Sequence, residues 1–263
     1  MPVHQSEALI LRTYKLGEAD RIVVFLTKDR GKKRGVAKGA RRARSRFTGA
    51  LEPLTRADVA YYERELRDLV RINYVEPLRS PLSAIDDVTS DIALGHVGYF
   101  AELIDEWAPE AHADERLYRL GASVVEALSG RAPVDRLARY FEYWLLRLQG
   151  VYPSVTACAA CAGPLEKGAV MAPREHVYVC RGCAPAAGGT SISAEALRFL
   201  REAAAAAPNR LAPLALSAPA GRELETAHRR LINVHLEKEL KSARVLREMS
   251  QGPQGSEASR VRR

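Results

Sequence analysis

The sequence predicts a multi-domain fold in which an N-terminal all-β barrel of the OB type precedes an α-helical domain with an inserted four-cysteine module. Three observations predict it. Residues 1–80 hold five short strand patterns, residues 81–249 repeat apolar side chains at helical spacing, and all four cysteines fall within 151–190. Pro77 and Pro81 mark the change from the first pattern to the second. Residues 250–263 have no apolar pattern, so we expect a disordered tail there.

The barrel is predicted from short apolar segments separated by turns. In the last of them Val70, Ile72 and Tyr74 alternate with Leu69, Arg71 and Asn73, as in a half-buried strand. Five strands in about 80 residues suit a small closed barrel, and the OB type presents an open face to oligonucleotides. Periodicity leaves an SH3-like barrel open as the alternative. The expected strands are 8–11, 22–27, 33–38, 54–62 and 68–75.

Most of the positive charge is concentrated in residues 28–46. Ten Lys or Arg residues and one acid give this segment a charge of +9, whereas the whole chain carries +8. Such density favours an anionic partner such as a phosphate backbone. A solvated loop or disordered basic arm is the alternative, but Gly31, Gly35 and Gly39 suit turns, and a strand pattern leads directly into the segment. The expected nucleic-acid-binding residues are Arg12, Arg30, Lys32, Lys33, Arg34, Lys38, Arg41, Arg42, Arg44 and Arg46.

The helical domain is predicted from apolar stripes. The third helix contains an aromatic cluster that we expect in the core rather than on a base-stacking surface, because large aromatics dominate core burial. His228 and His235 are seven residues apart on the last helix, and we expect packed histidines rather than metal ligands, which favour a four-residue spacing. The expected helices are 88–107, 116–128, 134–149, 194–207 and 222–249.

The cysteines form two CxxC pairs, Cys158 with Cys161 and Cys180 with Cys183, separated by eighteen residues. This spacing is typical of a zinc ribbon, in which two knuckles present four thiolates to one tetrahedral ion. Four protein ligands leave no position for a reactive water, so we expect one structural Zn2+ per chain. Disulfides, an empty site and a redox pair are the alternatives, and His176 is a possible substitute ligand.

The motifs of common catalytic and nucleotide-binding sites are missing from the sequence: GxxxxGK[ST], HExxH, GxSxG and a GxGxxG on a strand–helix turn. We therefore expect that the protein is not an enzyme. The N-terminus lacks the apolar core of a signal peptide, and no apolar run is long enough to span a membrane. A cytoplasmic protein without a membrane partner is the expectation. Aromatic residues make up 6% of the chain, so phosphate contacts should dominate nucleic-acid binding.

Together these segments resemble the RecO family of bacterial recombination-mediator proteins. The resemblance covers nearly the whole chain outside the linkers and the tail, and all four cysteines, which some family members lack, are present. It is carried by 7–12 (EALILR), 17–20 (GEAD), 25–27 (FLT), 35–42 (GVAKGARR), 45–47 (SRF), 51–53 (LEP), 141–142 (FE), 150–153 (GVYP) and 240–244 (LKSAR).

The resemblance implies a non-enzymatic, nucleoid-associated protein of DNA repair. Such proteins bind single- and double-stranded DNA and anneal complementary strands coated with single-stranded-DNA-binding protein. They also work with RecR to load RecA in homologous recombination. Two other classes remain open on the residues alone. One is a zinc-ribbon RNA-modifying or translation-associated enzyme with a basic OB domain, and the other is a structural interaction module.

Overall fold

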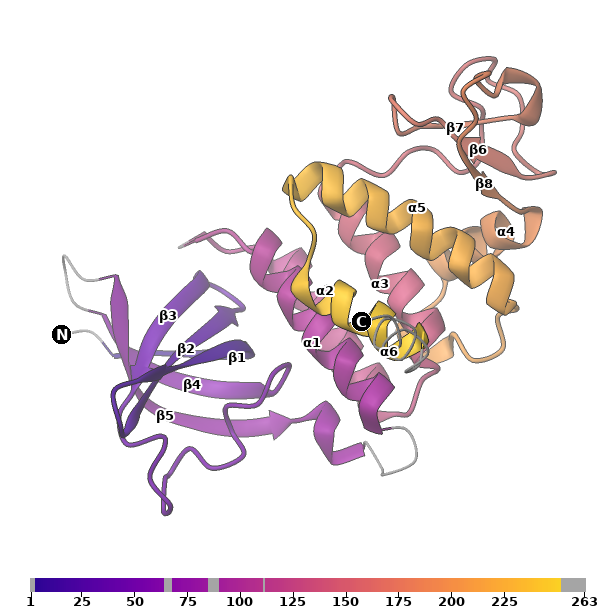
Figure 1. Cartoon of the computed structure of the whole chain (residues 1–263). Helices are drawn as coiled ribbons and strands as arrows, with labels where there is room; N and C mark the ends of the chain where they lie inside the picture. The colour runs from indigo at the N-terminus through magenta and orange to yellow at the C-terminus, as the bar shows by residue number, and fades with distance from the viewer. Residues whose placement is uncertain (1–2, 64–67, 85–89, 111, 252–263) are drawn as a thin grey trace, which may run out of the picture.

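The computed structural model describes residues 3–63, 68–84, 90–110 and 112–251 (Figure 1). Five strands close into a barrel in the order β1-β2-β3-β5-β4, with β3 and β5 parallel and the other pairs antiparallel. This is the predicted OB-like barrel rather than the SH3-like alternative. Its strands are β1 (Val3–Leu16), β2 (Asp20–Thr27), β3 (Gly31–Ala37), β4 (Arg56–Tyr62) and β5 (Leu69–Arg79).

Strand β1 is longer than the apolar pattern predicts. Its first half pairs with β4 from Val3 opposite Tyr62, and its second half pairs with β2 as far as Leu16 opposite Asp20. The backbone ladder therefore continues through polar residues that carry no hydrophobic signal. A bulge near Leu11 lies between the two halves, and bulges of this kind bend a strand in small barrels.

The barrel buries apolar side chains on both of its faces. Ile10, Phe25 and Tyr61 fill the interior, whereas Leu9 and Leu26 belong to the same hydrophobic core as the helices. Burial on both faces explains the continuous apolar run of β2, because alternation appears only where one face meets water. The barrel is thus packed directly against the helical domain.

Six α-helices follow the barrel in the described part of the chain, and α1 and α2 lie beside the barrel (Figure 1). The aromatic cluster of α3 lies in this core, as predicted: Phe141 is fully buried and its ring centroid is 5.0 Å from that of Phe100. The helices are α1 (Ser90–Trp107), α2 (Glu115–Ser129), α3 (Val134–Leu148), α4 (Ala194–Ala205), α5 (Ala218–Leu236) and α6 (Lys241–Gln251).

The single helix predicted over 222–249 is wrong, because this region forms two helices. Helix α5 begins earlier, with Ser217 as its N-cap, and ends where Glu237 adopts a left-handed conformation with φ of 55°. Helix α6 then packs on α1, and the Glu102 carboxylate accepts hydrogen bonds from the backbone N–H groups of Lys241 and Ser242. The apolar stripe continues across the break because both helices face the same core.

The cysteine segment lies between α3 and α4 and contains a small sheet in the order β7-β6-β8. In Figure 1 it stands at the end of the molecule away from the barrel. Of the predicted tail, 250–251 are the end of α6 and 252–263 lie outside the described residues. Among the described helices, none is both long enough and apolar enough to cross a membrane. The strands are β6 (Ala169–Met171), β7 (Tyr178–Val179) and β8 (Thr190–Ile192).

Candidate nucleic-acid interface and metal centre

A basic loop follows β3, and its cations are exposed. The loop is anchored, since Gly39 N–H donates to the Asp20 carboxylate at 2.8 Å and Arg41 N–H donates to the Ala19 carbonyl at 2.9 Å. Phe47 is buried in the barrel core. The loop is therefore a folded element of the barrel rather than a free basic arm. We define the basic loop by its exposed cations, Lys38, Arg41, Arg42, Arg44 and Arg46.

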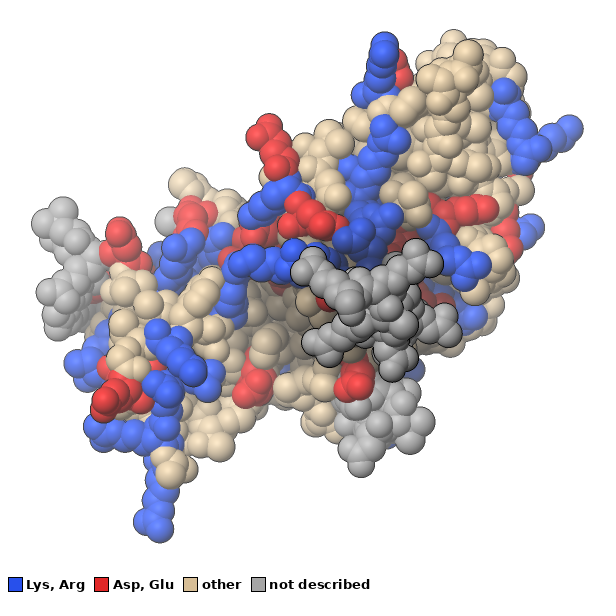
Figure 2. Space-filling model, in the orientation of Figure 1, with Lys and Arg blue, Asp and Glu red and all other residues tan. Residues whose placement is uncertain are grey.

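The basic loop presents its charges without a neighbouring acid in the same stretch, since residues 38–51 contain no Asp or Glu. Figure 2 shows Lys and Arg side chains grouped around the lower end of the barrel. The Arg46 guanidinium lies over the Phe47 ring, 5.0 Å from its centroid, and Arg41 donates to the Gly17 carbonyl. Cations held in this way are suited to phosphate contacts, which position a nucleic acid without reading its sequence.

Lys32, which the sequence predicts to bind nucleic acid, is buried in the structure. Its side chain is only 10% exposed, and its Nζ donates to the Asp105 carbonyl at 2.7 Å and lies 3.3 Å from the Asp105 carboxylate. Lys32 therefore belongs to the contact between β3 and α1 and not to an exposed phosphate-binding face. Sequence reasoning missed this because Asp105 is 73 positions away along the chain.

Other predicted cations are paired. Arg12 forms an ion pair with Asp105, Lys33 with Glu63, and the Arg34 guanidinium lies 3.2 Å from a Glu110 oxygen. Arg30 remains exposed, with a weak contact to Asp29 at 3.7 Å. The ten predicted residues thus fall into three groups. Five belong to the basic loop, and Arg30 and Arg34 are exposed and contact exposed acids. The other three, Arg12, Lys32 and Lys33, pair with less exposed acids.

The four cysteine sulfurs form a compact cluster. All four Sγ atoms lie within 4.8 Å of one another, and those of Cys161 and Cys180 are 3.8 Å apart. Four sulfurs about 2.3 Å from a tetrahedral ion stand about 3.8 Å from each other. The cluster therefore fits a metal ion in the way the CxxC spacing predicts. His176, the suggested substitute ligand, is not a member of the cluster.

The surroundings of the cluster shift the pKa values of two of its thiols in opposite directions. Backbone N–H donation, first from Cys180 and then from Cys161, lowers the pKa of the Cys158 thiol to about 6. Hydrogen bonds to the Cys180 and Cys161 sulfurs raise the pKa of Cys183 to about 12. A cation bound by the four sulfurs would favour their thiolate form.

A buried polar network connects the cysteine module to the helices. Glu142 on α3 accepts hydrogen bonds from Tyr99 O–H at 2.7 Å and His228 Nδ1 at 2.8 Å, and it pairs with Arg139 at 3.0 Å. Tyr152 O–H lies 2.7 Å from His228 Nε2 and 3.2 Å from Tyr178 O–H, two residues before Cys180. His228 is therefore a packed histidine, as predicted.

Sequence reasoning missed Glu142 as the centre of this network. Burial raises its pKa, but the Arg139 charge and the hydrogen bond from His228 outweigh burial, so that the pKa is lowered overall. The available signal was a lone carboxylate inside the aromatic cluster of α3. His235, the other histidine of that predicted stripe, stacks on Trp107 with ring centroids 5.6 Å apart.

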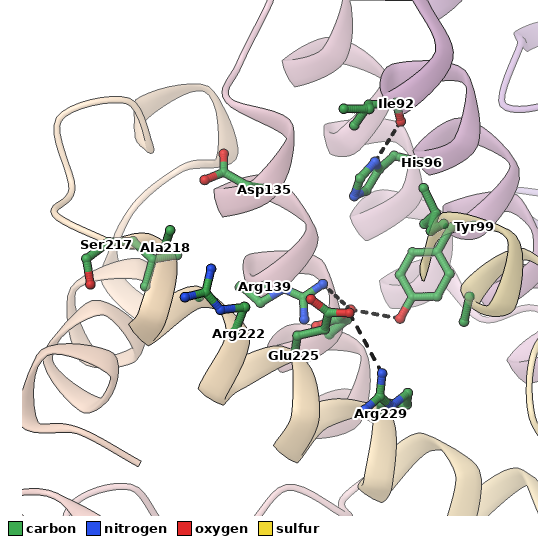
Figure 3. Close-up of a pocket in the computed structure, with 15 residues that line it drawn as sticks. Ile92, His96, Tyr99, Asp135, Arg139, Ser217, Ala218, Arg222, Glu225 and Arg229 are labelled. Carbon is green, nitrogen blue, oxygen red and sulfur yellow. Dashed lines mark hydrogen bonds and ion pairs between the residues drawn. The ribbon is translucent and has the colours of Figure 1, made fainter. Parts of the chain in front are cut away.

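A pocket of about 300 Å³ opens between α1, α3, α5 and α6 (Figure 3). Arg139 reaches it from α3, and Arg222 and Arg229 reach it from α5. Among the described residues the Arg139 Nη1 atom is buried without a hydrogen-bond partner. Ile92 and Leu216 add apolar surface. Asp135, Glu142 and Glu225 line the same pocket, so its positive and negative side chains are balanced.

The fold and these sites define a class of protein in which an OB-like barrel with a basic loop is docked on a helical domain that carries a four-cysteine module. The family model "Recombination protein O N terminal" matches residues 1–81, and "Recombination protein O C terminal" matches residues 91–244. The chain belongs to the RecO family, whose members act in DNA repair and recombination.

Individual relatives agree with this assignment. The chain is 41% identical to the DNA repair protein RecO of Koribacter versatilis over 176 residues, which are 67% of this chain and 70% of the relative. It is 36% identical to RecO of Anaeromyxobacter sp. strain K over 248 residues, covering 92% and 94% of the two chains. With RecO of Desulforudis audaxviator it shares 33% identity over 95% of this chain and 98% of the relative.

Proposed function

We propose that this protein is a recombination mediator that binds single- and double-stranded DNA. It anneals complementary strands coated with single-stranded-DNA-binding protein and, with RecR, helps load RecA. It acts as an adaptor rather than an enzyme. The observation that carries the proposal is the anchored basic loop on an OB-like barrel in a member of the RecO family.

The proposed mechanism of annealing is electrostatic. Two strands repel each other through their phosphates, and the basic loop neutralises one strand while releasing counterions. A second, weaker surface on the C-terminal helices holds the other strand. Of the cations there, Lys241 and Arg244 are exposed, although Arg244 lies 4.0 Å from a Glu248 oxygen. Arg230 donates to the Pro173 carbonyl, and the Arg229 side chain is only 30% exposed and lies 3.9 Å from Glu225. The second surface is therefore centred on Lys241 and Arg244.

The proposed cofactor is one structural zinc ion per chain, held by Cys158, Cys161, Cys180 and Cys183. When bound, it cross-links the two knuckles through thiolate bonds. The residues of this chain then have only structural roles around it: the Cys180 N–H orients the Cys158 sulfur at 3.2 Å, and Tyr178 joins the module to the buried polar network.

The deciding experiment is an annealing assay on complementary strands coated with the cognate single-stranded-DNA-binding protein, without ATP. We compare the parent with a variant in which Arg41, Arg42, Arg44 and Arg46 are replaced by Ala. The matched control removes four exposed cations from the helical domain, Arg116, Arg119, Arg198 and Arg210.

Both variants lose the same net charge, so a difference between their annealing rates shows where the DNA-binding cations lie. The basic-loop variant should anneal slowly, and the slope of log affinity against log salt should fall by about one unit for each lost phosphate contact. The control should stay close to the parent. Equal annealing by both variants, or a parent that requires ATP, would contradict the proposal.

A further inference from the structure

The outer face of the barrel carries a second, chemically different feature beside the basic loop. Helices α1 and α2 cover part of this face, and Val24 on β2 is buried there. Tyr14 on β1, Arg34 on β3 and Leu69 on β5 are exposed beside the covered part. A pocket of about 410 Å³ lies there. Its lining residues are Arg12, Tyr14, Ile22, Val24, Lys32, Arg34, Leu69, Asp105 and Glu106.

The strand register brings apolar and aromatic side chains together in this pocket. Tyr14 on β1 is opposite Ile22 on β2, and Arg34 on β3 is opposite Leu69 on β5. Tyr14 is 45% exposed and Leu69 is 36% exposed. Tyr14 and Leu69 lie beside the aliphatic side chains of Ile22 and Val24. Together they offer an apolar surface for a planar group.

The charges of the pocket favour an anionic chain. The acids on its α1 side already have partners: Asp105 pairs with Arg12 and Lys32, and Glu106 lies 2.6 Å from Lys238. The Arg34 side chain is 55% exposed, and its contact with exposed Glu110 is of a kind that contributes little. Arg34 is therefore available to a phosphate.

The pocket is also continuous with the basic loop. Arg34 lies in β3, and Lys38 follows that strand four residues later, a span of about 13 Å along an extended backbone. The Arg12 guanidinium is 5.6 Å from the centroid of the Tyr14 ring and occupies one face of it. A base would therefore contact the exposed part of the Tyr14 side chain that Arg12 leaves uncovered. A backbone that crosses the basic loop can reach the pocket.

We propose that this pocket binds one unpaired nucleobase of a single strand, with the base against Tyr14 and Leu69 and the adjoining phosphate at Arg34. The inference rests on the proposed DNA-binding function and deepens it. Base stacking on an aromatic ring is tolerant of sequence but requires a base that has left the duplex stack. The pocket therefore lets the barrel distinguish single-stranded from double-stranded DNA, which the basic loop does not do.

The test uses the full chain and the variants Tyr14→Ala and Tyr14→Phe, with Tyr62→Ala as the matched control on β4 outside the pocket. Affinity is measured for a single strand of twenty thymidine nucleotides, for an abasic strand of the same length, and for a duplex. Tyr14→Ala should weaken binding to the thymidine strand about tenfold, the expected loss of one base–aromatic contact.

The same variant should leave binding to the abasic strand and the duplex within about twofold, because neither supplies a free base. Tyr14→Phe should match the parent, since the ring and not the hydroxyl makes the contact. Equal losses on the thymidine and abasic strands, or no loss on either, would overturn the proposal. Weakened binding of a RecR-type protein partner with unchanged DNA binding would also overturn it and would identify a protein interface.

Failure of this inference is distinguishable from failure of the proposed function. If the basic-loop variant loses DNA binding while Tyr14→Ala keeps it on every strand, the mediator function stands and the base subsite is wrong. If the parent itself binds none of the three nucleic acids, the proposed function fails first.

Discussion

Single residues of the basic segment have different roles although the sequence makes them look alike. Lys32 and Arg42 are ten positions apart in one run of positive charge. Lys32 is buried against α1 and contacts Asp105, whereas Arg42 is exposed on the basic loop. Burial decides the role, because a desolvated charge must keep its partner and a solvated one is available to phosphate.

We expect Lys32→Ala to lower the free energy of unfolding by about 3 kcal/mol, since it leaves a buried carboxylate with one partner fewer. The salt dependence of DNA binding should not change, because Lys32 Nζ is engaged with Asp105 and the proposed phosphate contact of that pocket is Arg34. Arg42→Ala should do the reverse, with unfolding unchanged and the salt slope reduced by about one unit. Urea unfolding and titrations at several salt concentrations measure both effects. A changed salt slope in Lys32→Ala would place that side chain at the DNA.

His228 should make stability depend on pH. Its burial lowers its pKa below the usual 6.5, although the Glu142 carboxylate opposes the shift. The unfolded chain therefore binds a proton more readily than the folded one, and stability should fall as pH decreases below about 6.5. Glu142, whose pKa is also lowered, should add a further loss below about 4.5.

Urea unfolding at pH 7.5 and pH 5.5 measures this dependence. The variant His228→Gln should be less stable at pH 7.5, because the buried Tyr152 and Glu142 lose a fitted partner, but it should lose less stability on acidification than the parent. An unchanged pH dependence in the variant would show that other groups carry the effect.

At the scale of elements, the cysteine module has little secondary structure of its own. Strands β6 and β8 have three residues each and β7 has two. Strands this short do not hold a sheet together alone. A metal ion on the four sulfurs would supply the missing cross-link, because metal binding and local folding are coupled.

We expect about one zinc ion per chain in the reduced protein, and much less in Cys161→Ser. Chelation should increase hydrogen exchange in residues 158–183 and leave the barrel strands protected. Metal analysis and hydrogen exchange measure these outcomes, with Ser154→Ala as a control beside the cluster. A metal-free protein with a Cys158–Cys161 disulfide would contradict the expectation.

At the scale of the whole molecule, the barrel and the helices share one core. Gly121 on α2 allows Leu9 of β1 to approach, since a β-carbon at this glycine would lie 2.6 Å from a Leu9 methyl carbon. On the outside, Arg56 and Arg79 both donate to the Glu126 carboxylate of α2. The barrel and helical domain should therefore unfold together rather than one at a time.

We expect Gly121→Leu to force the barrel and α2 apart, with a lower melting temperature and increased binding of an apolar dye. Gly98→Ala on α1 is the matched control, because a β-carbon there has no atom within 4 Å among the described residues. The control should be neutral or slightly stabilising. A normal melting temperature in Gly121→Leu would mean that the contact between barrel and helices is loose.

Because the barrel and the helices share a core, a separated barrel would not keep the surface that it has in the whole chain. Residues 1–80 in isolation would expose Leu9, Leu11, Val24 and Leu26, which the helices cover in the whole chain. Charge variants of the full chain are therefore a sounder test of the two DNA surfaces than separated domains.

The sequence by itself determined the features that depend on neighbours along the chain. The barrel strands follow from local apolar patterns, the cysteine cluster from two CxxC pairs, and the basic loop from a local run of charge. A knuckle or a turn is built from residues a few positions apart, so the local sequence is enough to predict its geometry.

Only the tertiary structure decided which charges remain free and which are buried. Lys32 contacts Asp105, Arg56 contacts Glu126, and Glu142 contacts His228. The partners in each pair are 70 or more positions apart along the chain. The break at Glu237 likewise depends on α6 packing back onto α1. Desolvation and pairing are properties of the packed chain, and no local pattern specifies which distant carboxylate will meet a given cation.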